Sequence, residues 1–173
     1  MSLLINPRDM DFVLYELLDA EHLTQSDIFA DLDRDTFNAV IGTAKKLAED
    51  KFEPFAAKLD ANEPTFDGNV VYIIPEVKKA LDAYVEAGFM GIAADADDGG
   101  MQLPWVIAQA ACAYIAAADV SANAYPFLTH AGINLLSTYG SKPQKDKYLK
   151  PLIEGRFFGT MCLSEPQAGS SLS

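Results

Sequence analysis

The residues best placed to do chemistry lie near the carboxyl end, where the chain reads MCLSEPQAGSSLS over residues 161–173. A strand-like run leads there into a stretch of Pro, Gly and Ser, the residue types that favour turns. The stretch carries one carboxylate, Glu165, and a carboxylate can act as a general base. Taken alone, the pattern is better explained as an ordinary polar turn with an exposed or capping carboxylate.

The acidic loop ADADDGG is a second candidate, because Asp95 and Asp97 stand two apart before a glycine pair. A calcium loop of the EF-hand type needs an oxygen ligand at its fifth position and a Glu at its twelfth. Counted from Asp95, those positions are Gly99 and Val106. The spacing therefore indicates a solvated loop and no calcium site.

The chain has two histidines and two cysteines, all far apart in the sequence. This scatter argues against a zinc site, and we expect no metal centre. Cys112 and Cys162 are predicted to be buried thiols. His22 carries no signal, whereas His130 either borders a ligand pocket or, as we favour, is a hydrogen-bonded histidine of the core or surface.

Two further groups have a structural and a functional interpretation. The lysines of KPQKDKYLK are explained by a solvated helix face without a phosphate ligand. Four aromatic residues either line a ligand cleft or, as we favour, belong to the core: Tyr125, Phe127, Phe157 and Phe158.

The composition excludes several classes of function. The net charge is −12, and residues 1–100 carry 8 − 21 = −13 of it, so the acid lies in the first half. Such a charge repels phosphate backbones and anionic lipids, which excludes nucleic acid and the membrane surface as partners. No apolar run is long enough to span a bilayer, and we expect a cytoplasmic protein.

The elements that must position these residues are helices. Apolar residues recur at helical spacing through most of the chain, and prolines and glycines delimit the segments. Ser141 and Gln144 form a predicted capping box. The expected helices cover residues 9–19, a long segment from Asp33 that Pro54 bends or restarts, residues 75–87, 104–118 and 126–139, and a short helix after Ser141; residues 62–74 are predicted to be a connector with one short extended piece.

The pattern changes after Gly155, where RFFGTMCLSE lacks helical period and is rich in strand-forming residues. A single strand leaves its backbone donors and acceptors unpaired and is not stable alone. The chain therefore reads as an all-α domain that ends at the first strand of a truncated β domain. We expect an N-terminal extension helix in residues 1–32, a helical domain in 33–155 and the start of the β domain in 156–173.

Residues 132–170 resemble the acyl-CoA dehydrogenase family, in which a similar ordered pattern joins the helical domain to the first β strand. The quoted stretch is GINLLSTYGSKPQKDKYLKPLIEGRFFGTMCLSEPQAGS, and GFMGIAADADDGGMQLP resembles a loop of the same family. The long amino-terminal start is similar to the branch of 3-methylmercaptopropionyl-CoA dehydrogenases. Two departures stand out: Ala93, Ala94 and Asp95 replace a Val-Pro-Glu-like run, and Ser171 replaces an Asp.

The resemblance implies FAD as cofactor and an acyl-CoA as substrate. Met161, Leu163 and Ser164 would contact the flavin ring, whose polar edge can be matched by the backbone of an extended strand. Gly169 would permit close backbone approach to the cofactor, and Ser170 would hydrogen-bond the phosphopantetheine or acyl-CoA atoms nearby.

The resemblance also implies the reaction, removal of a proton alpha to a thioester with hydride transfer to the flavin. The family's carboxylate base comes from a later domain, so no catalytic residue is named in this chain, and Glu165 remains a turn residue. The fragment alone is expected to be inactive. An electron-transfer flavoprotein and a homodimer or homotetramer are the implied partners.

Two alternatives remain open. The chain could be a non-catalytic helical module for dimerisation or regulation that is derived from this family. It could also belong to a member diverted to another acyl-CoA reaction. The length of the reading frame distinguishes the first alternative, and a panel of thioesters distinguishes the second.

Overall fold

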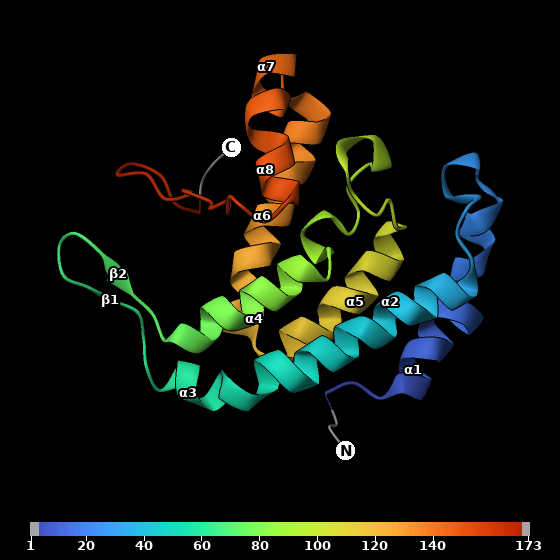
Figure 1. The fold of residues 1–173 in the computed structure, drawn as a ribbon, viewed down its shortest axis with the longest axis horizontal. Coiled ribbons are helices and arrows are strands. Elements are labelled where there is room, and N and C mark those ends of the chain that lie inside the picture. Colours follow the sequence, from blue (N-terminus) through green and yellow to red (C-terminus); the bar gives the residue numbers. More distant parts are fainter. Residues whose placement is uncertain (1–3, 171–173) are drawn as a thin grey trace.

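The computed structural model describes residues 4–170, and nearly all of its regular structure is helical (Figure 1). The principal helices are α1 (Pro7–Asp11), α2 (Arg34–Leu47), α3 (Ala56–Asp60), α4 (Pro75–Glu86), α5 (Trp105–Ala118), α6 (Val120–Tyr139), α7 (Lys142–Gln144) and α8 (Lys150–Ile153). π-helical segments cover Phe12–Leu17, Ala48–Phe52 and Lys145–Leu149, and 3₁₀ turns cover Ala20–Gln25, Asp27–Phe29, Glu53–Phe55, Phe89–Gly91 and Ala96–Asp98. The all-α prediction is confirmed.

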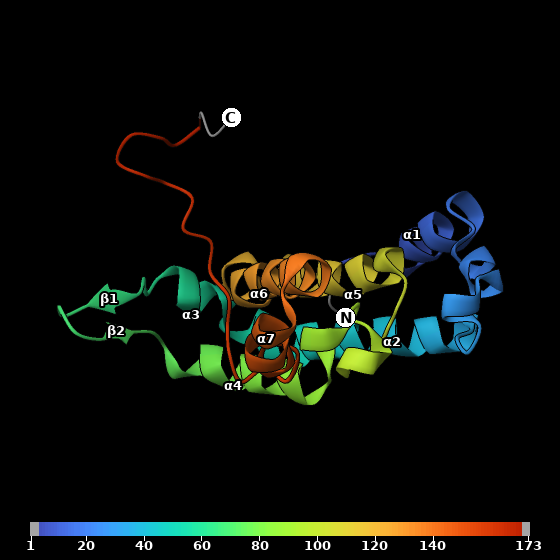
Figure 2. The ribbon, with the colours of Figure 1, turned by 90° about the horizontal axis from the view of Figure 1, so that it is seen from above.

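The helices form two layers around one main core. Figure 2 shows α5 and α6 in one layer and α2 and α4 in the other. The largest fully buried side chains of the core include Phe37, Phe52, Tyr84 and Tyr114. A smaller apolar cluster joins α6 to the last helices through Ile133, Leu149, Leu152 and Ile153.

Helix ends follow local sequence signals at several predicted positions. α4 begins at Pro75, and Gly88 after it is left-handed at φ +76, as expected at a helix end. The Ser141 amide donates to Gln144 Oε1 at 2.8 Å, which confirms the capping contact before α7. Pro54 lies in the 3₁₀ turn Glu53–Phe55, which separates the π-helical segment after α2 from α3. The long helix is therefore interrupted at the predicted proline.

The start of α6 was predicted wrongly. The helix begins at Val120, and Pro126 lies inside it instead of opening it. The Asp119 carboxylate accepts the Ala122 amide at 2.9 Å and caps the helix, so the true start is an acid before an apolar run. This one helix carries both His130 and Thr129, the residue that bonds to the chain's last segment.

The connector between α3 and α4 contains two short strands where one extended piece was expected. β1 (Thr65–Phe66) and β2 (Val71–Tyr72) pair in antiparallel fashion, with Thr65 opposite Tyr72. The turn between them is held by Asp67, whose Oδ1 accepts the amides of Asn69 and Val70. In Figure 1 this hairpin projects from the helical body.

Candidate functional site

The segment that carries the predicted cofactor residues leaves the helices at Gly155. The Gly155 amide donates to Leu152 O and the Arg156 amide to Pro151 O, the two bonds of a Schellman motif. Gly155 has φ +69, and a Cβ there would lie 2.4 Å from Val85 Cγ2. Glycine is therefore required at this turn by its conformation and by its space.

A second contact fixes the start of the tail, which we define as residues 156–170. The Gly159 amide donates to Thr129 Oγ1 at 3.0 Å, and that hydroxyl donates in turn to Tyr125 O at 2.7 Å. Thr129 is fully buried on α6. A Cβ at Gly159 would meet the α6 backbone at 3.3 Å, so the tail lies directly against this helix.

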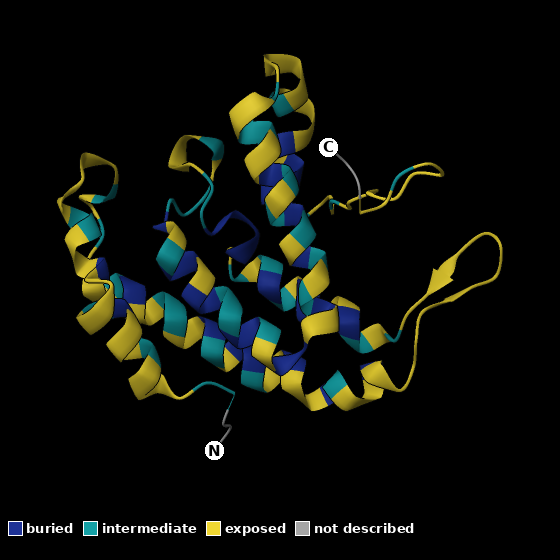
Figure 3. Ribbon diagram, turned by 180° about the vertical axis from the view of Figure 1, so that it is seen from behind, coloured by how far each residue is buried: buried dark blue, intermediate teal, exposed yellow. Residues whose placement is uncertain are grey.

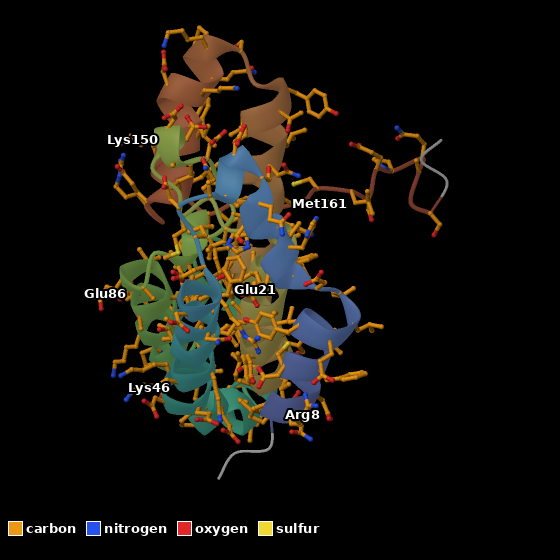
Figure 4. The ribbon with its side chains drawn as sticks, turned by 90° about the vertical axis from the view of Figure 1, so that its right-hand side faces the viewer. Arg8, Glu21, Lys46, Glu86, Lys150 and Met161 are labelled. Atoms are coloured by element: carbon orange, nitrogen blue, oxygen red, sulfur yellow. The ribbon has the colours of Figure 1, made fainter. Side chains whose placement is uncertain are left out.

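Beyond Gly159 the tail extends away from the helical body, and its described residues are exposed except the half-buried Ala168 (Figure 3). Met161, Leu163 and Ser164 are all exposed, Met161 at 60%. Figure 4 shows Met161 on the tail beyond the helices. Within the described residues no backbone hydrogen bond involves residues 160–164, and no strand forms there. This agrees with the expectation that a lone strand has nothing to pair with.

The polar turn is formed as predicted. The Glu165 and Ala168 backbones pair with each other at 2.8 and 3.2 Å, which makes a tight reversal across Pro166 and Gln167. Gly169 and Ser170 follow it and are exposed, and nothing lies within 4 Å of a Cβ placed on Gly169. The roles of these residues toward a ligand stay predictions. Ser171 and the rest of the predicted β segment lie outside the described residues.

Some burial predictions were wrong. Cys162 is exposed, because its segment packs on nothing in the described chain. Phe127, Phe157 and Phe158 are exposed at 63%, 45% and 41%, so they are not core residues. Only Tyr125 packs against the main core, where it is partly buried.

Two cavities lie between α5 and α6. The smaller cavity, about 250 Å³, is lined by Trp105, Gln109, Cys112, Asn123, Phe127, His130, Ala131 and Asn134. The larger of the two, about 440 Å³, also reaches the amino-terminal segment and the loop before α5, and its further lining is mostly apolar: Ile28, Phe29, Met90, Ile92, Ala93, Ala94, Asp95, Gln102, Leu103, Ala108, Ile133 and Ser137. The two cavities are adjacent, because four residues line both of them: Trp105, Gln109, His130 and Asn134.

His130 combines the two roles considered for it. Its Nε2 lies 3.0 Å from Phe89 O and 3.5 Å from the Tyr84 hydroxyl, so it is hydrogen-bonded, and its ring also lines both cavities. Tyr84 contacts Cys112 Sγ at 3.7 Å. Tyr84 was not singled out as a site residue, although its helical spacing from Val77 and Leu81 marks it as core-facing.

Burial favours the uncharged forms of His130, Tyr84 and Cys112. Burial lowers the pKa of His130, against a smaller raising effect of the Phe89 carbonyl. Burial raises the pKa of Cys112, and burial followed by the nearby thiol raises that of Tyr84 well above its usual value. All three side chains are therefore uncharged near pH 7. The cluster offers neither a thiolate nor a charged acid, and it suits an uncharged ligand.

The described residues contain no group of three or more His, Cys, Asp or Glu that could hold a metal ion. No helix among them is long and apolar enough to cross a membrane. The lysines of the α7–α8 region are engaged locally: Lys142 pairs with Asp146 at 3.0 Å, and Lys145 Nζ donates to Ser137 O at 2.6 Å. These contacts fit the interpretation as a solvated helix face.

Comparison with known proteins places this architecture. Residues 34–156 match the model of the acyl-CoA dehydrogenase N-terminal domain. The chain is 32% identical to 3-methylmercaptopropionyl-CoA dehydrogenase of Ruegeria pomeroyi and 31% identical to a broad-specificity linear acyl-CoA dehydrogenase of Mycobacterium tuberculosis, in each case over 96% of the chain. It covers only 28% and 27% of those two proteins' lengths.

Solved structures agree in fold. A structure described as the electron transferring flavoprotein of Acidaminococcus fermentans matches with a TM-score of 0.64 and 26% identity, over 80% of this chain and 33% of that one. Butyryl-CoA dehydrogenase from Megasphaera elsdenii matches with a TM-score of 0.63 at 22% identity, over 83% of this chain and 34% of the other. The chain therefore belongs to the acyl-CoA dehydrogenase family, and its helical fold is that of the family's N-terminal domain.

Proposed function

We propose that this chain is the N-terminal part of an FAD-dependent acyl-CoA dehydrogenase, which oxidises an acyl-CoA thioester to the trans-2-enoyl-CoA. The observation that carries the proposal is the tail, whose family-like sequence presents a backbone over residues 160–164 that has no hydrogen-bond partner in the described chain. When bound, FAD supplies the acceptor for the hydride that leaves the substrate's β carbon. In this proposal the base would come from a later domain of the complete protein.

The residues present fit one edge of a flavin. The backbone of residues 160–164 has no partner in the described chain, and an extended backbone offers the alternating donors and acceptors that a flavin edge needs. We assign Met161, Leu163 and Ser164 to this edge, Ser164 also through its hydroxyl, and Gly169 to close approach. Ser170 would hydrogen-bond acyl-CoA atoms. A donor near the flavin's reducible edge stabilises negative charge there.

The remaining partners follow from the same proposal. Electrons would pass to an electron-transfer flavoprotein, and the whole protein would be a homodimer or homotetramer in the cytoplasm. The structure described as an electron transferring flavoprotein supports the first of these by similarity. The alternative function is a non-catalytic helical module for dimerisation or regulation that is derived from this family.

The test uses the product of the complete reading frame that encodes these residues. That product is expected to be yellow and to reduce a dye when given acyl-CoA, whereas the 173 residues alone are expected to show no turnover. Ser164→Ala is expected to shift the flavin spectrum or weaken flavin retention, and Ser26→Ala, at an exposed serine far from the tail in sequence, serves as control. A native stop after Ser173, or a colourless complete product, would contradict the proposal.

A further inference from the structure

Apart from tyrosines, Thr129 and Asp119 are the only buried polar or charged residues of the described chain. The Asp119 carboxylate accepts the Ala122 amide and so serves its own helix. The Thr129 hydroxyl also bonds within α6, since it donates to Tyr125 O at 2.7 Å, but its oxygen accepts a second bond from the Gly159 amide at 3.0 Å. Thr129 is thus the buried polar side chain of α6 that reaches another part of the chain.

The direction of both bonds is fixed by their partners. A carbonyl oxygen can only accept and a backbone amide can only donate, so the hydroxyl proton points to Tyr125 O and a lone pair faces Gly159. The bond to the carbonyl four residues earlier is local to the helix. The bond to Gly159 joins residues thirty positions apart in the sequence, and it therefore bears on how the tail is placed.

The Gly159 contact is the last point at which the tail is attached to the helices. Apart from this bond, residues 158–170 make no hydrogen bond to the helices in the described chain. Gly159 also approaches α6 closely, because a Cβ there would lie 3.3 Å from Leu128 O and 3.3 Å from Thr129 Cα. Its φ is not positive, so the close approach, and not the backbone conformation, favours glycine here.

The residues assigned to the flavin edge follow this attachment directly. Met161 stands two positions and Ser164 five positions after Gly159. An extended chain advances at most about 3.3–3.6 Å per residue, so Met161 lies within about 7 Å of Gly159 and Ser164 within about 18 Å. Because the backbone of residues 160–164 has no partner in the described chain, the place of Gly159 sets where this stretch begins relative to α6.

We propose that Thr129 is a positioning residue for the flavin edge: its hydroxyl holds Gly159 against α6 and thereby sets the place of the backbone of residues 161–164. Thr129 acts through the tail and does not touch the cofactor, since it is fully buried. This inference rests on the proposed function. Hydrogen bonds between the tail and a flavin form at donor–acceptor distances of about 2.7–3.2 Å. A shift of about 1 Å at the attachment is therefore enough to misplace them.

The test compares variants of the complete product, each first checked for a cooperative unfolding transition. Thr129→Val keeps the shape of the side chain but removes the hydroxyl, so the Gly159 amide loses its acceptor. The dissociation constant of FAD is expected to rise about 3–10-fold, the worth of one net hydrogen bond. The flavin absorbance bands are expected to shift and the midpoint potential to become more negative, because misplaced donors stabilise the negative charge of the reduced flavin less.

Two further variants separate positioning from stability. Thr129→Ser keeps the hydroxyl and is expected to retain the absorbance bands, the FAD affinity and the potential of the unaltered protein. Ile115→Val removes one methylene from a fully buried residue of α5 that lines neither cavity. It is expected to lower the stability of the helices and to leave all three flavin properties unchanged.

Gly159→Ala perturbs the same attachment from the other side. The amide is kept, but the added methyl meets the α6 backbone at 3.3 Å and displaces the tail. The midpoint potential is expected to move in the same direction as in Thr129→Val, by a smaller amount. This variant decides the test if Thr129→Val does not fold.

The outcomes are distinct. A yellow product whose absorbance bands, FAD affinity and potential are unchanged in both Thr129→Val and Gly159→Ala overturns this inference and leaves the proposed function standing. The inference is also overturned if Thr129→Ser behaves like Thr129→Val, or if Ile115→Val changes the potential as much. A colourless unaltered product contradicts the proposed function, and this inference falls with it.

Discussion

Replacing Gly155 with alanine is expected to destabilise the chain by about 2–5 kcal/mol, because two costs add at this turn. Gly155 has φ +69, and the left-handed conformation costs an alanine about 1–2 kcal/mol. The new Cβ would also lie 2.4 Å from Val85 Cγ2 and 2.8 Å from Val85 Cγ1, and overpacking of this kind costs about 1–3 kcal/mol. Val85 is β-branched on α4, so its side chain cannot rotate away freely.

Urea unfolding followed by far-UV circular dichroism measures the loss, and a double-mutant cycle separates its parts. In a Val85→Ala background the two closest contacts are removed and only the Cβ contact at 3.1 Å remains, so Gly155→Ala is expected to cost less there, about 1–2 kcal/mol. Gly169→Ala is the control, since nothing lies within 4 Å of its added Cβ, and its effect is expected within about 0.5 kcal/mol. If Gly155→Ala cost no more than Gly169→Ala, the account of the turn would be refuted.

Thr129→Val is expected to cost about 0.5–1.5 kcal/mol and to speed hydrogen exchange of the Gly159 amide, because the Thr129 hydroxyl accepts that amide at 3.0 Å. Thr43→Val, whose hydroxyl bonds only to its own helix, is the control and is expected to leave that amide unchanged. The buried His130 has a lowered pKa, so the unfolded chain binds its proton more readily. The free energy of unfolding is therefore expected to keep this contribution above about pH 6.5 and to lose it as the pH falls below that value, as read from urea midpoints. His130→Gln is expected to flatten this dependence and the exposed His22→Gln to retain it; equal profiles for the two variants would contradict the burial argument.

The helices could be predicted where the chain itself carries the start and stop signals. Helix ends lie at three residues predicted from the sequence: α4 begins at Pro75 and is followed by Gly88, and α6 ends before Gly140. Each of these residues affects helix formation through the conformation of its own backbone. Pro126 misled for the same reason. A proline fits a first turn, but the Asp119 cap sets the start of α6 at Val120, six residues before Pro126, so the proline lies inside the helix.

Burial of the tail could not be predicted from residue type. Phe157, Phe158 and Cys162 are of types that are commonly buried, yet burial requires a second layer of structure, and the tail packs on none in the described chain. The cavities were missed as well. They join Ile28 to Ser137, residues more than a hundred positions apart, and no local pattern specifies which helices meet. His130 could be considered from the sequence because it lies on the apolar helix predicted after Pro126.

Thr129 and His130 are neighbours on α6, yet one holds the tail and the other lines both cavities. A helix behaves as a stiff rod over this length, so these two attachments cannot move independently. A displacement of the helix near His130 therefore also moves Thr129, which anchors the start of the tail. The shape of the cavities and the position of the tail are therefore coupled through two adjacent residues of α6.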